Sequence, residues 1–234
     1  EISPSYEDAD LVVVNTCAFI DEARKESIDT ILALDDQRKV GGKLVVTGCM
    51  AERYGDELAE ALPEVDQVAG LGVPVNLVKK RSIAVSSAPI PTLDLLNLPR
   101  PKSSSPWAYV KIAEGCDRNC GFCAIPSFRG PQRSRDISSI LDEVEQLEAQ
   151  EIVLVAQDLA SYGKDRPTEL GAGSIVPLVR AVSATAAWTR LLYLYPSDLS
   201  DELIDAICDT GVPYFDLSLQ HVSKPLLRRM RRWG

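Results

Sequence analysis

The chain has 234 residues, enough for one large domain or two smaller ones, and its hydrophobic fraction of 45% allows a sizeable buried core. A formal net charge of -9 argues against broad, nonspecific nucleic-acid binding but leaves room for a local basic patch. No apolar run is long enough to be a transmembrane helix, and none resembles a signal peptide. Three of the six cysteines are clustered and three are scattered, which fits metal use in a reducing compartment better than disulfides. We therefore expect a cytoplasmic protein with no membrane partner.

The first half of the sequence alternates short apolar runs with helical patterns. The runs at 11–15 (LVVVN) and 43–47 (KLVVT) are typical of strands buried on both faces. Amphipathic stretches follow them, at about 20–32 and 51–62, and residues 67–69 and 75–80 predict a third short strand and a helix. This alternation predicts a parallel α/β sheet.

Two of the scattered cysteines come directly after the predicted strands of this first half. Cys17 and Cys49 each follow the carboxyl end of a strand, the edge along which ligands bind in open α/β sheets. Two cysteines at equivalent positions on neighbouring strands are able to meet there. The alternative is that both are buried cysteines that pack as small hydrophobic residues.

Residues 83–106 change in composition, because Ser and Pro dominate them. Pro disfavours regular structure, so we interpret this stretch as an inter-domain linker with its boundary at about 98–106. This predicts one domain over 1–97 and a second over 107–234. Residue 1 is not Met, and the chain stops at Trp233-Gly234 inside a helical, basic pattern, so we expect a fragment of a longer protein.

The second half again alternates strands and helices. Strands are expected at 109–112, 151–156, 190–195 and 214–219, and helices at 137–147, 175–184, 200–208 and 222–232. Asp136 is a candidate N-cap for the first of these helices. The loop at 157–173 is too long and polar for a simple connection, which suggests a functional loop.

The most specific motif is a group of three cysteines in one loop after the 109–112 strand. Cys116, Cys120 and Cys123 are separated by three and then two residues. Thiolates are soft ligands that select zinc, copper(I) or iron–sulfur clusters, and a structural zinc site needs a fourth protein ligand. A [4Fe–4S] cluster held by three cysteines leaves one iron open to bind something else, which makes it the favoured interpretation. The alternatives are a zinc knuckle with a distant fourth ligand and a reduced loop without metal.

The motif and its surroundings resemble the radical S-adenosylmethionine (SAM) enzymes. The string from Ala108 to Cys116 (AYVKIAEGC) and the string from Ile125 to Gly130 (IPSFRG) are similar to one branch of them, the methylthiotransferases. The resemblance implies a partial (βα) barrel for the second half, of which four of six units are expected here. It also implies that the open iron binds SAM and that an electron from the cluster cleaves SAM to a 5′-deoxyadenosyl radical.

The first half resembles the flavodoxin-like amino-terminal module of the same family. The strings around Cys17 (VNTCAFI) and Cys49 (VTGCMAE) carry this resemblance. It implies an auxiliary [4Fe–4S] cluster on three cysteines that holds the sulfur to be inserted. Only two are present here, because none of the sixteen residues before Cys17 is a cysteine.

Three further strings resemble the branch that modifies a protein rather than transfer RNA. They are LLYLYP at 191–196, DLSLQH at 216–221 and Gln157-Asp158. The implied reaction adds a methylthio group, with a second SAM as methyl donor, to the β-carbon of an aspartate in a small-subunit ribosomal protein. A reductant such as a flavodoxin is implied as a partner. A tRNA adenosine as substrate, and a zinc-stabilised binding module without catalysis, remain the alternatives.

Residues at the strand ends are candidates for contacting SAM, although helix capping and loop closure are the plainer interpretation. We interpret His221 as a structural hydrogen-bonding residue, Cys208 as a core residue, and the arginines of 228–232 as a solvated helix end. The candidates for cofactor binding are Gln157, Asp158, Tyr195, Gln220, Arg129 and Arg135.

Overall fold

A computed structural model describes residues 3, 5–73, 75, 82–84, 96–97, 102, 104–166 and 174–232. The chain divides into two compact units, Glu1–Leu95 and Leu96–Gly234, each with its own hydrophobic core. The division lies just before the predicted linker at 98–106. No helix in the described part of the chain is long and apolar enough to cross a membrane.

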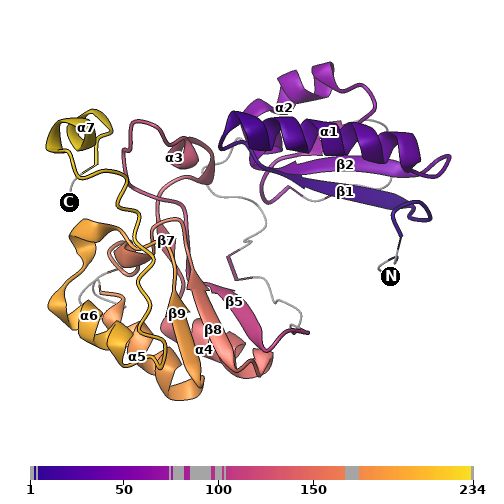
Figure 1. Cartoon of the computed structure of the whole chain (residues 1–234). Helices are drawn as coiled ribbons and strands as arrows, with labels where there is room; N and C mark the ends of the chain where they lie inside the picture. The colour runs from indigo at the N-terminus through magenta and orange to yellow at the C-terminus, as the bar shows by residue number, and fades with distance from the viewer. Residues whose placement is uncertain are drawn as a thin grey trace. The chain divides into compact units, whose positions relative to one another are not determined.

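The first unit is a parallel four-stranded sheet in the order β1-β2-β3-β4, with two helices on one face (Figure 1). Both crossovers step across the sheet in the same direction, so right-handed connections place both helices on the same side. The core joins the helices to the sheet through Ile31, Leu44, Val46 and Met50. The elements are β1 (Leu11–Thr16), α1 (Asp21–Gln37), β2 (Lys43–Gly48), α2 (Cys49–Ala61), β3 (Gln67–Ala69) and β4 (Ser82–Ala84).

Two expectations for this unit are wrong. The β1 strand is buried on one face only: Val12 and Val14 pack in the core, whereas Val13 is 46% exposed. In the described sheet β1 is an edge strand, and both helices cover the face on which Val12 and Val14 lie. The continuous apolar run of β1 is therefore buried on that face only. Ser82–Ala84 forms a strand paired with β3, although it overlaps the predicted linker. The expected helix at 75–80 lies outside the described residues, apart from residue 75.

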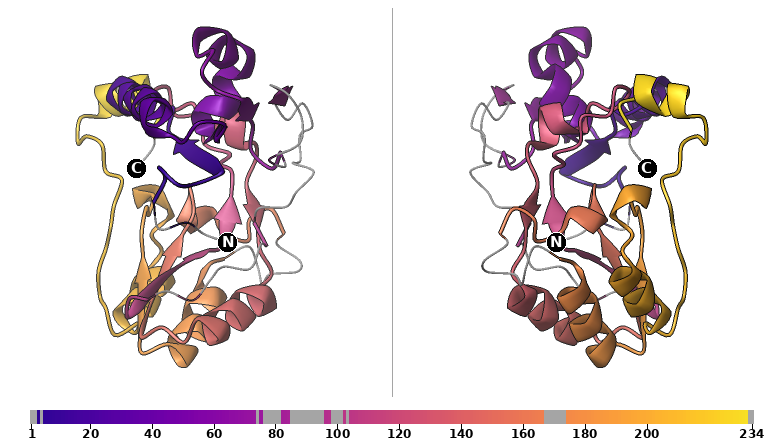
Figure 2. Two further views of the ribbon diagram at one scale, coloured as in Figure 1. Left: turned by 90° about the vertical axis from the view of Figure 1, so that its right-hand side faces the viewer. Right: turned by 90° about the vertical axis from the view of Figure 1, so that its left-hand side faces the viewer.

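The second unit is built on a parallel sheet in the order β5-β8-β9, which confirms the expected α/β class. Three helices pack side by side on one face of this sheet, in the magenta to orange part of the ribbon (Figures 1 and 2). Ile140, Leu154, Leu178 and Leu191 are among the fully buried side chains between the sheet and the helices. The elements are β5 (Trp107–Lys111), α4 (Ile137–Leu147), β8 (Glu151–Val155), α5 (Val176–Thr185), β9 (Trp188–Leu191) and α6 (Asp201–Cys208).

Short elements that the sequence did not predict surround the carboxyl ends of these strands. A two-stranded antiparallel pair, β6 (Ala113–Glu114) with β7 (Arg133–Ser134), encloses the three-cysteine loop and α3 (Ile125–Arg129). Two single 3-10 turns, η1 (Leu159–Ser161) and η2 (Pro196–Asp198), follow β8 and β9. These elements place the loop at the edge where ligands bind in parallel sheets.

The expected fourth strand at 214–219 does not form within the described residues. Only one isolated bridge joins Leu194 to Leu217. Tyr193 has a left-handed φ of 64° and its N–H donates to the Asp216 carboxylate, so the extended conformation is interrupted after Leu191. The expected strand at 190–195 is correspondingly shorter, and it begins earlier.

Three further predictions need correction. The helix α7 (Lys224–Arg229) is shorter than the expected 222–232. Asp136 occupies the N-cap position of α4, but its side chain makes no capping bond and pairs with Arg166 instead. Cys208 is exposed rather than buried, because the core face of α6 is formed by Leu203, Ala206 and Ile207, and the next residue turns away.

Candidate functional site

The three-cysteine loop is closed at its base by a narrow neck. Glu114 pairs with Arg133 across β6 and β7, and the Cys116 N–H donates to the Gly130 carbonyl at 3.1 Å. Gly115 has a φ of +84°, and a Cβ atom there would lie 2.1 Å from the Pro131 carbonyl oxygen. Only glycine fits this position, so the neck presents the loop as one unit at the carboxyl end of β5.

The three thiols of the loop differ in their exposure. Cys116 is buried, and Cys120 and Cys123 are half-buried. Burial, together with the nearby Asp158 carboxylate and the other two thiols, raises the pKa of the Cys116 thiol to about 11, against a hydrogen bond from the Arg118 N–H. A bound metal deprotonates such a thiol, so Cys116 is suited to be a ligand and poorly suited to be a free nucleophile.

The donor set of the loop fits an iron–sulfur cluster. The loop supplies three thiols, and thiolates are the usual ligands of such clusters. In the described part of the chain, no group of three Cys, His, Asp or Glu side chains converges closely enough to hold a single metal ion. Each thiolate of a cubane cluster binds a different iron, so that finding bears on a single-ion site and not on a cluster.

Arg118, which lies between the first two cysteines, connects the loop to Asp158 after β8 and to Asp198 after β9. Its Nε donates to Asp158 Oδ2 at 2.6 Å, and its terminal nitrogen pairs with Asp198 and donates to the Ser161 hydroxyl. Asp198 also pairs with Lys164 at 3.2 Å. Asp158 and Asp198 outweigh the effect of burial and raise the pKa of Arg118, so Arg118 stays charged. We call Arg118 and these two carboxylates the Arg118 clamp.

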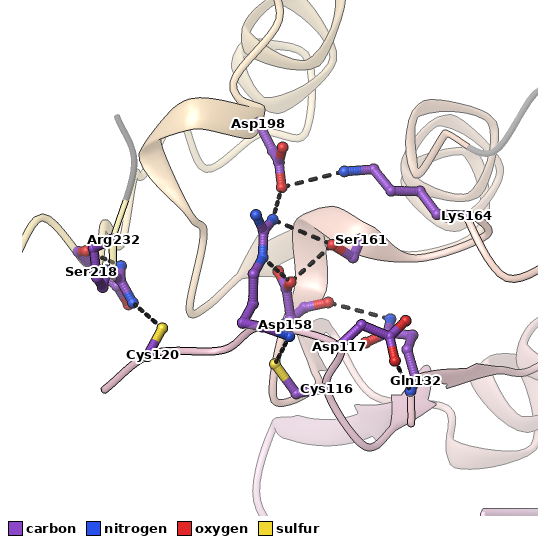
Figure 3. Close-up of polar contacts among 11 residues, drawn as sticks. Cys116, Asp117, Cys120, Gln132, Asp158, Ser161, Lys164, Asp198, Ser218 and Arg232 are labelled. Carbon is purple, nitrogen blue, oxygen red and sulfur yellow. Dashed lines mark hydrogen bonds and ion pairs between the residues drawn. The ribbon is translucent and has the colours of Figure 1, made fainter. Parts of the chain in front are cut away.

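A second contact reaches the loop from the end of the chain. The Arg232 side chain donates to Cys120 Sγ at 3.7 Å and also to the Ser218 carbonyl (Figure 3). The guanidinium groups of Arg118 and Arg232 both lie over the Tyr195 ring, each 4.0 Å from its centroid. Tyr195 therefore links the two arginines that touch the loop.

A polar cluster next to the neck consists of Glu114, Gln157 and Arg129. Gln157 accepts a bond from the Gly115 N–H at 3.0 Å and donates to Glu114 Oε1 at 3.1 Å. Glu114 also pairs with Lys111 at 2.5 Å and with Arg129 at 3.1 Å. Burial alone would raise the pKa of Glu114, but Arg129, Lys111 and Arg133 together hold it below its usual value. Glu114 is thus a buried carboxylate that fixes Arg129 beside the loop.

The predicted cofactor-binding residues therefore separate into two sets. Gln157, Asp158, Tyr195 and Arg129 all contact the cysteine loop or its neck. Arg135 is 4% exposed, and its guanidinium donates hydrogen bonds to Asn97, Lys111, Ser139 and Glu143. These contacts indicate a structural role.

Gln220 belongs to neither set. It is exposed and has a left-handed φ of 60°. Its neighbour Leu219 lines a cavity of about 220 Å³ together with Pro196, Val222 and Arg232. His221 borders the same cavity and accepts a bond from the Ser223 N–H at 2.8 Å.

Sequence reasoning missed several residues of this site, namely Glu114, Arg118, Gln132, Asp198 and Arg232. The position of Arg118 inside the cysteine motif was the one local signal. Arg232 was grouped with its neighbours as solvated, whereas only Arg228, Arg229 and Arg231 are exposed. Asp158 Oδ1 and Gln132 Oε1 are buried without a hydrogen-bond partner in the described part of the chain. Such atoms are acceptors that a bound molecule with donor groups would satisfy.

In the first unit, the register of β1 and β2 places Cys17 and Cys49 at the same edge. Thr16 pairs with Gly48, and each cysteine is the next residue. Gly48 has a φ of +94°, and a Cβ atom there would lie 2.5 Å from the Thr16 carbonyl oxygen, so glycine permits the close approach. Cys17 is exposed and Cys49 is half-buried, so the alternative of two fully buried cysteines is wrong.

Comparisons with known proteins match both units. The model of the radical SAM superfamily matches residues 110–234, and that of the uncharacterized protein family UPF0004 matches residues 1–70. The ribosomal protein uS12 methylthiotransferase RimO of Geobacter sulfurreducens is 44% identical, with 99% of this chain and 55% of the relative covered. The RimO of Anaeromyxobacter sp. (strain K) is also 44% identical, with 96% and 50% covered.

The chain spans about half the length of these curated relatives. Among solved structures, the radical S-adenosylmethionine methyltransferase TsrM from Kitasatospora setae, with cobalamin and a [4Fe-4S] cluster bound, aligns with a TM-score of 0.63. Its identity is 16%, and the alignment covers 95% of this chain and 51% of that one, so the likeness concerns the fold alone.

Proposed function

The chain belongs to the radical SAM superfamily, and on this premise we propose that it is a methylthiotransferase. The proposed reaction adds a methylthio group to the β-carbon of an aspartate in a small-subunit ribosomal protein. The relatives' names, which give ribosomal protein uS12 as their substrate, support this choice. The motifs at 191–196 and 216–221 point the same way.

The observation that carries the proposal is the way the three-cysteine loop is held at the carboxyl end of β5. Cys116, Cys120 and Cys123 are the proposed ligands of a [4Fe–4S] cluster, in a loop fixed by the Gly115 neck and by the Arg118 clamp. When bound, this cluster supplies the electron that cleaves SAM to a radical able to remove an unactivated hydrogen. The residues of this chain have to fix the loop, bind SAM and keep water away.

SAM is proposed to bind beside the loop, where two buried acceptors lack partners among the residues that the structure describes. Asp158 Oδ1 and Gln132 Oε1 fit the donors of SAM, which are its ammonium group and its ribose hydroxyls. Tyr195 positions Arg118 and Arg232 beside the loop, and Arg129 beside the neck is suited to the carboxylate of SAM. Gln157 positions the neck through its bond to the Gly115 N–H.

Cys17 and Cys49 are proposed as two ligands of the auxiliary [4Fe–4S] cluster that would hold the inserted sulfur. Their adjacent positions at one sheet edge support this assignment. We accordingly assign residues 1–97 to the amino-terminal methylthiotransferase domain, 98–106 to a linker and 107–234 to a partial radical SAM core. A ribosomal substrate implies a cytoplasmic location, and a flavodoxin-like reductant is the proposed electron source.

The test is SAM cleavage by the anaerobically reconstituted chain. With dithionite as reductant, the chain should convert SAM to 5′-deoxyadenosine and methionine. In preparations that also bind the auxiliary cluster, which would supply the sulfur, mass spectrometry should find a methylthio group on an aspartate of added small-subunit ribosomal protein. The Cys120→Ala variant is the negative control. A methylthio group on a tRNA adenosine instead would replace the substrate assignment, and a zinc-containing chain without SAM cleavage would replace the enzyme assignment.

A further inference from the structure

Arg232 is a buried cation close to the cysteine loop. The residue is 8% exposed, whereas Arg228, Arg229 and Arg231 of the same segment are exposed. Its guanidinium contacts Cys120 Sγ, the Ser218 carbonyl and the Tyr195 ring. The backbone supports this position, because the Gly121 N–H donates to the Met230 carbonyl at 2.8 Å. The segment after α7 is therefore attached to the loop by both backbone and side chain.

Within the part of the chain that the structure describes, no carboxylate pairs with Arg232. Arg118, over the same Tyr195 ring, has Asp158 and Asp198 as ion-pair partners. Among the ion pairs of the described residues, Arg232 has none, and its contacts are a carbonyl, an aromatic ring and a thiol. A buried cation without an anion is costly, and the second guanidinium at the same ring increases that cost. The group next to Arg232 that becomes anionic on binding iron is Cys120.

We infer that Arg232 is the charge partner of the cluster-bound Cys120 thiolate and that it raises the reduction potential of the cluster. This inference rests on the proposed cluster at Cys116, Cys120 and Cys123. A [4Fe–4S] cluster on three thiolates is an anion, and reduction by one electron makes its charge more negative. A fixed cation that donates a hydrogen bond to a ligand sulfur stabilises the reduced form more than the oxidised form. Arg232 is thus a positioning residue that makes reduction of the cluster more favourable.

The test compares three variants of the full chain after anaerobic reconstitution. Arg232→Gln removes the charge and keeps a donor, Arg232→Lys keeps the charge, and Arg228→Gln removes an exposed charge from the same segment. Iron content and the midpoint potential, followed by electron paramagnetic resonance of the reduced cluster, are measured for each. We expect a more negative potential for Arg232→Gln, and potentials near that of the parent for the other two.

A parent-like potential in Arg232→Gln would overturn the inference, and so would equal shifts in the Gln and Lys variants, because charge would then not matter. If Arg232→Gln does not fold, the parent chain provides a second measurement. Cluster loading should slow the modification of Arg232 by phenylglyoxal relative to Arg228, and an unchanged ratio would overturn the inference. A parent chain that binds no iron would instead contradict the proposed function.

Discussion

The two groups of cysteines are assembled in different ways. One loop contains Cys116, Cys120 and Cys123, so their short sequence separation keeps them close together. Cys17 and Cys49 lie at the ends of different strands, and only the register of β1 with β2 brings them to one edge. The loop depends on its neck and on Arg118, whereas the pair depends on the first unit's whole sheet. Each site should therefore fail for a different reason.

The largest effect is expected for loss of a loop ligand. Cys116→Ala should reduce the iron bound after reconstitution from about four per chain to nearly none, because two thiolates do not hold the cluster. Cys208→Ala is the matched control, since Cys208 is exposed at the end of α6. Iron analysis of both variants checks this prediction. Equal iron in Cys116→Ala and in the parent would show that the loop is not the site.

The neck of the loop gives the next largest effect. Gly115→Ala forces a left-handed φ on alanine and places its Cβ against the Pro131 carbonyl, so it should cost more than about 3 kcal/mol and lower cluster loading. Gly130→Ala has a similar φ, but nothing lies within 4 Å of its Cβ, so only backbone strain of about 1–3 kcal/mol remains. Thermal unfolding and iron analysis compare the two. Equal losses would contradict the steric explanation.

The same comparison in the first unit should give a smaller effect, confined to that unit. Gly48→Ala should cost more than about 2 kcal/mol, because its Cβ would lie against the Thr16 backbone, which cannot move away as the Asn15 side chain can. Gly41→Ala has open space and should cost about 1 kcal/mol. Iron bound by the loop should stay unchanged in both variants. Loss of that iron in Gly48→Ala would mean that the loop depends on the first unit.

The smallest effect concerns pH and the first unit alone. Burial would raise the pKa of Asp66, but the Leu44 N–H and Arg38 outweigh it and hold the pKa below its usual value. A lowered folded pKa contributes stability above the unfolded pKa, and that stability is lost as the pH falls through the folded pKa. Asp66→Asn should therefore cost about 1 kcal/mol or less at pH 7, because the side chain is 40% exposed.

Urea unfolding at neutral pH and at about pH 3 checks the Asp66 prediction. The difference between the parent and Asp66→Asn should shrink at the lower pH, because Asp66 then takes up its proton in the unfolded parent. Asp56→Asn, on the exposed side of α2, is the control and should behave like the parent. A difference of equal size at both pH values would contradict the role given to the Arg38–Asp66 pair.

Much of this organisation follows from local patterns in the sequence. The alternation of apolar runs and helical stretches predicted the parallel sheets, and the cysteine spacing predicted the site loop. The contacts that hold the loop were not predictable in this way. Arg118 meets Asp158 and Asp198 because β8 and β9 end beside β5, and Arg232 reaches Cys120 from more than a hundred residues along the chain. Periodicity carries no information about such tertiary pairs.

Where the structure differs from what the sequence suggested, the difference has a physical cause. The expected strand at 214–219 has a suitable apolar pattern, but the left-handed turn at Tyr193 leaves its neighbour unable to continue the ladder. Arg135 was predicted to bind a cofactor because it follows the loop, but its guanidinium is hydrogen-bonded to Asn97 and Glu143 inside the protein. The Arg135 case shows that a residue's position in the chain does not fix the direction of its side chain.

The central claim is that the loop at Cys116, Cys120 and Cys123 holds a SAM-binding [4Fe–4S] cluster. The most direct measurement is anaerobic reconstitution followed by iron counting and by electron paramagnetic resonance with and without SAM. We predict about four irons per chain and a reduced-cluster signal that shifts when SAM is added. About eight irons would add a cluster at Cys17 and Cys49. Zinc without iron, or a signal that ignores SAM, would contradict the claim.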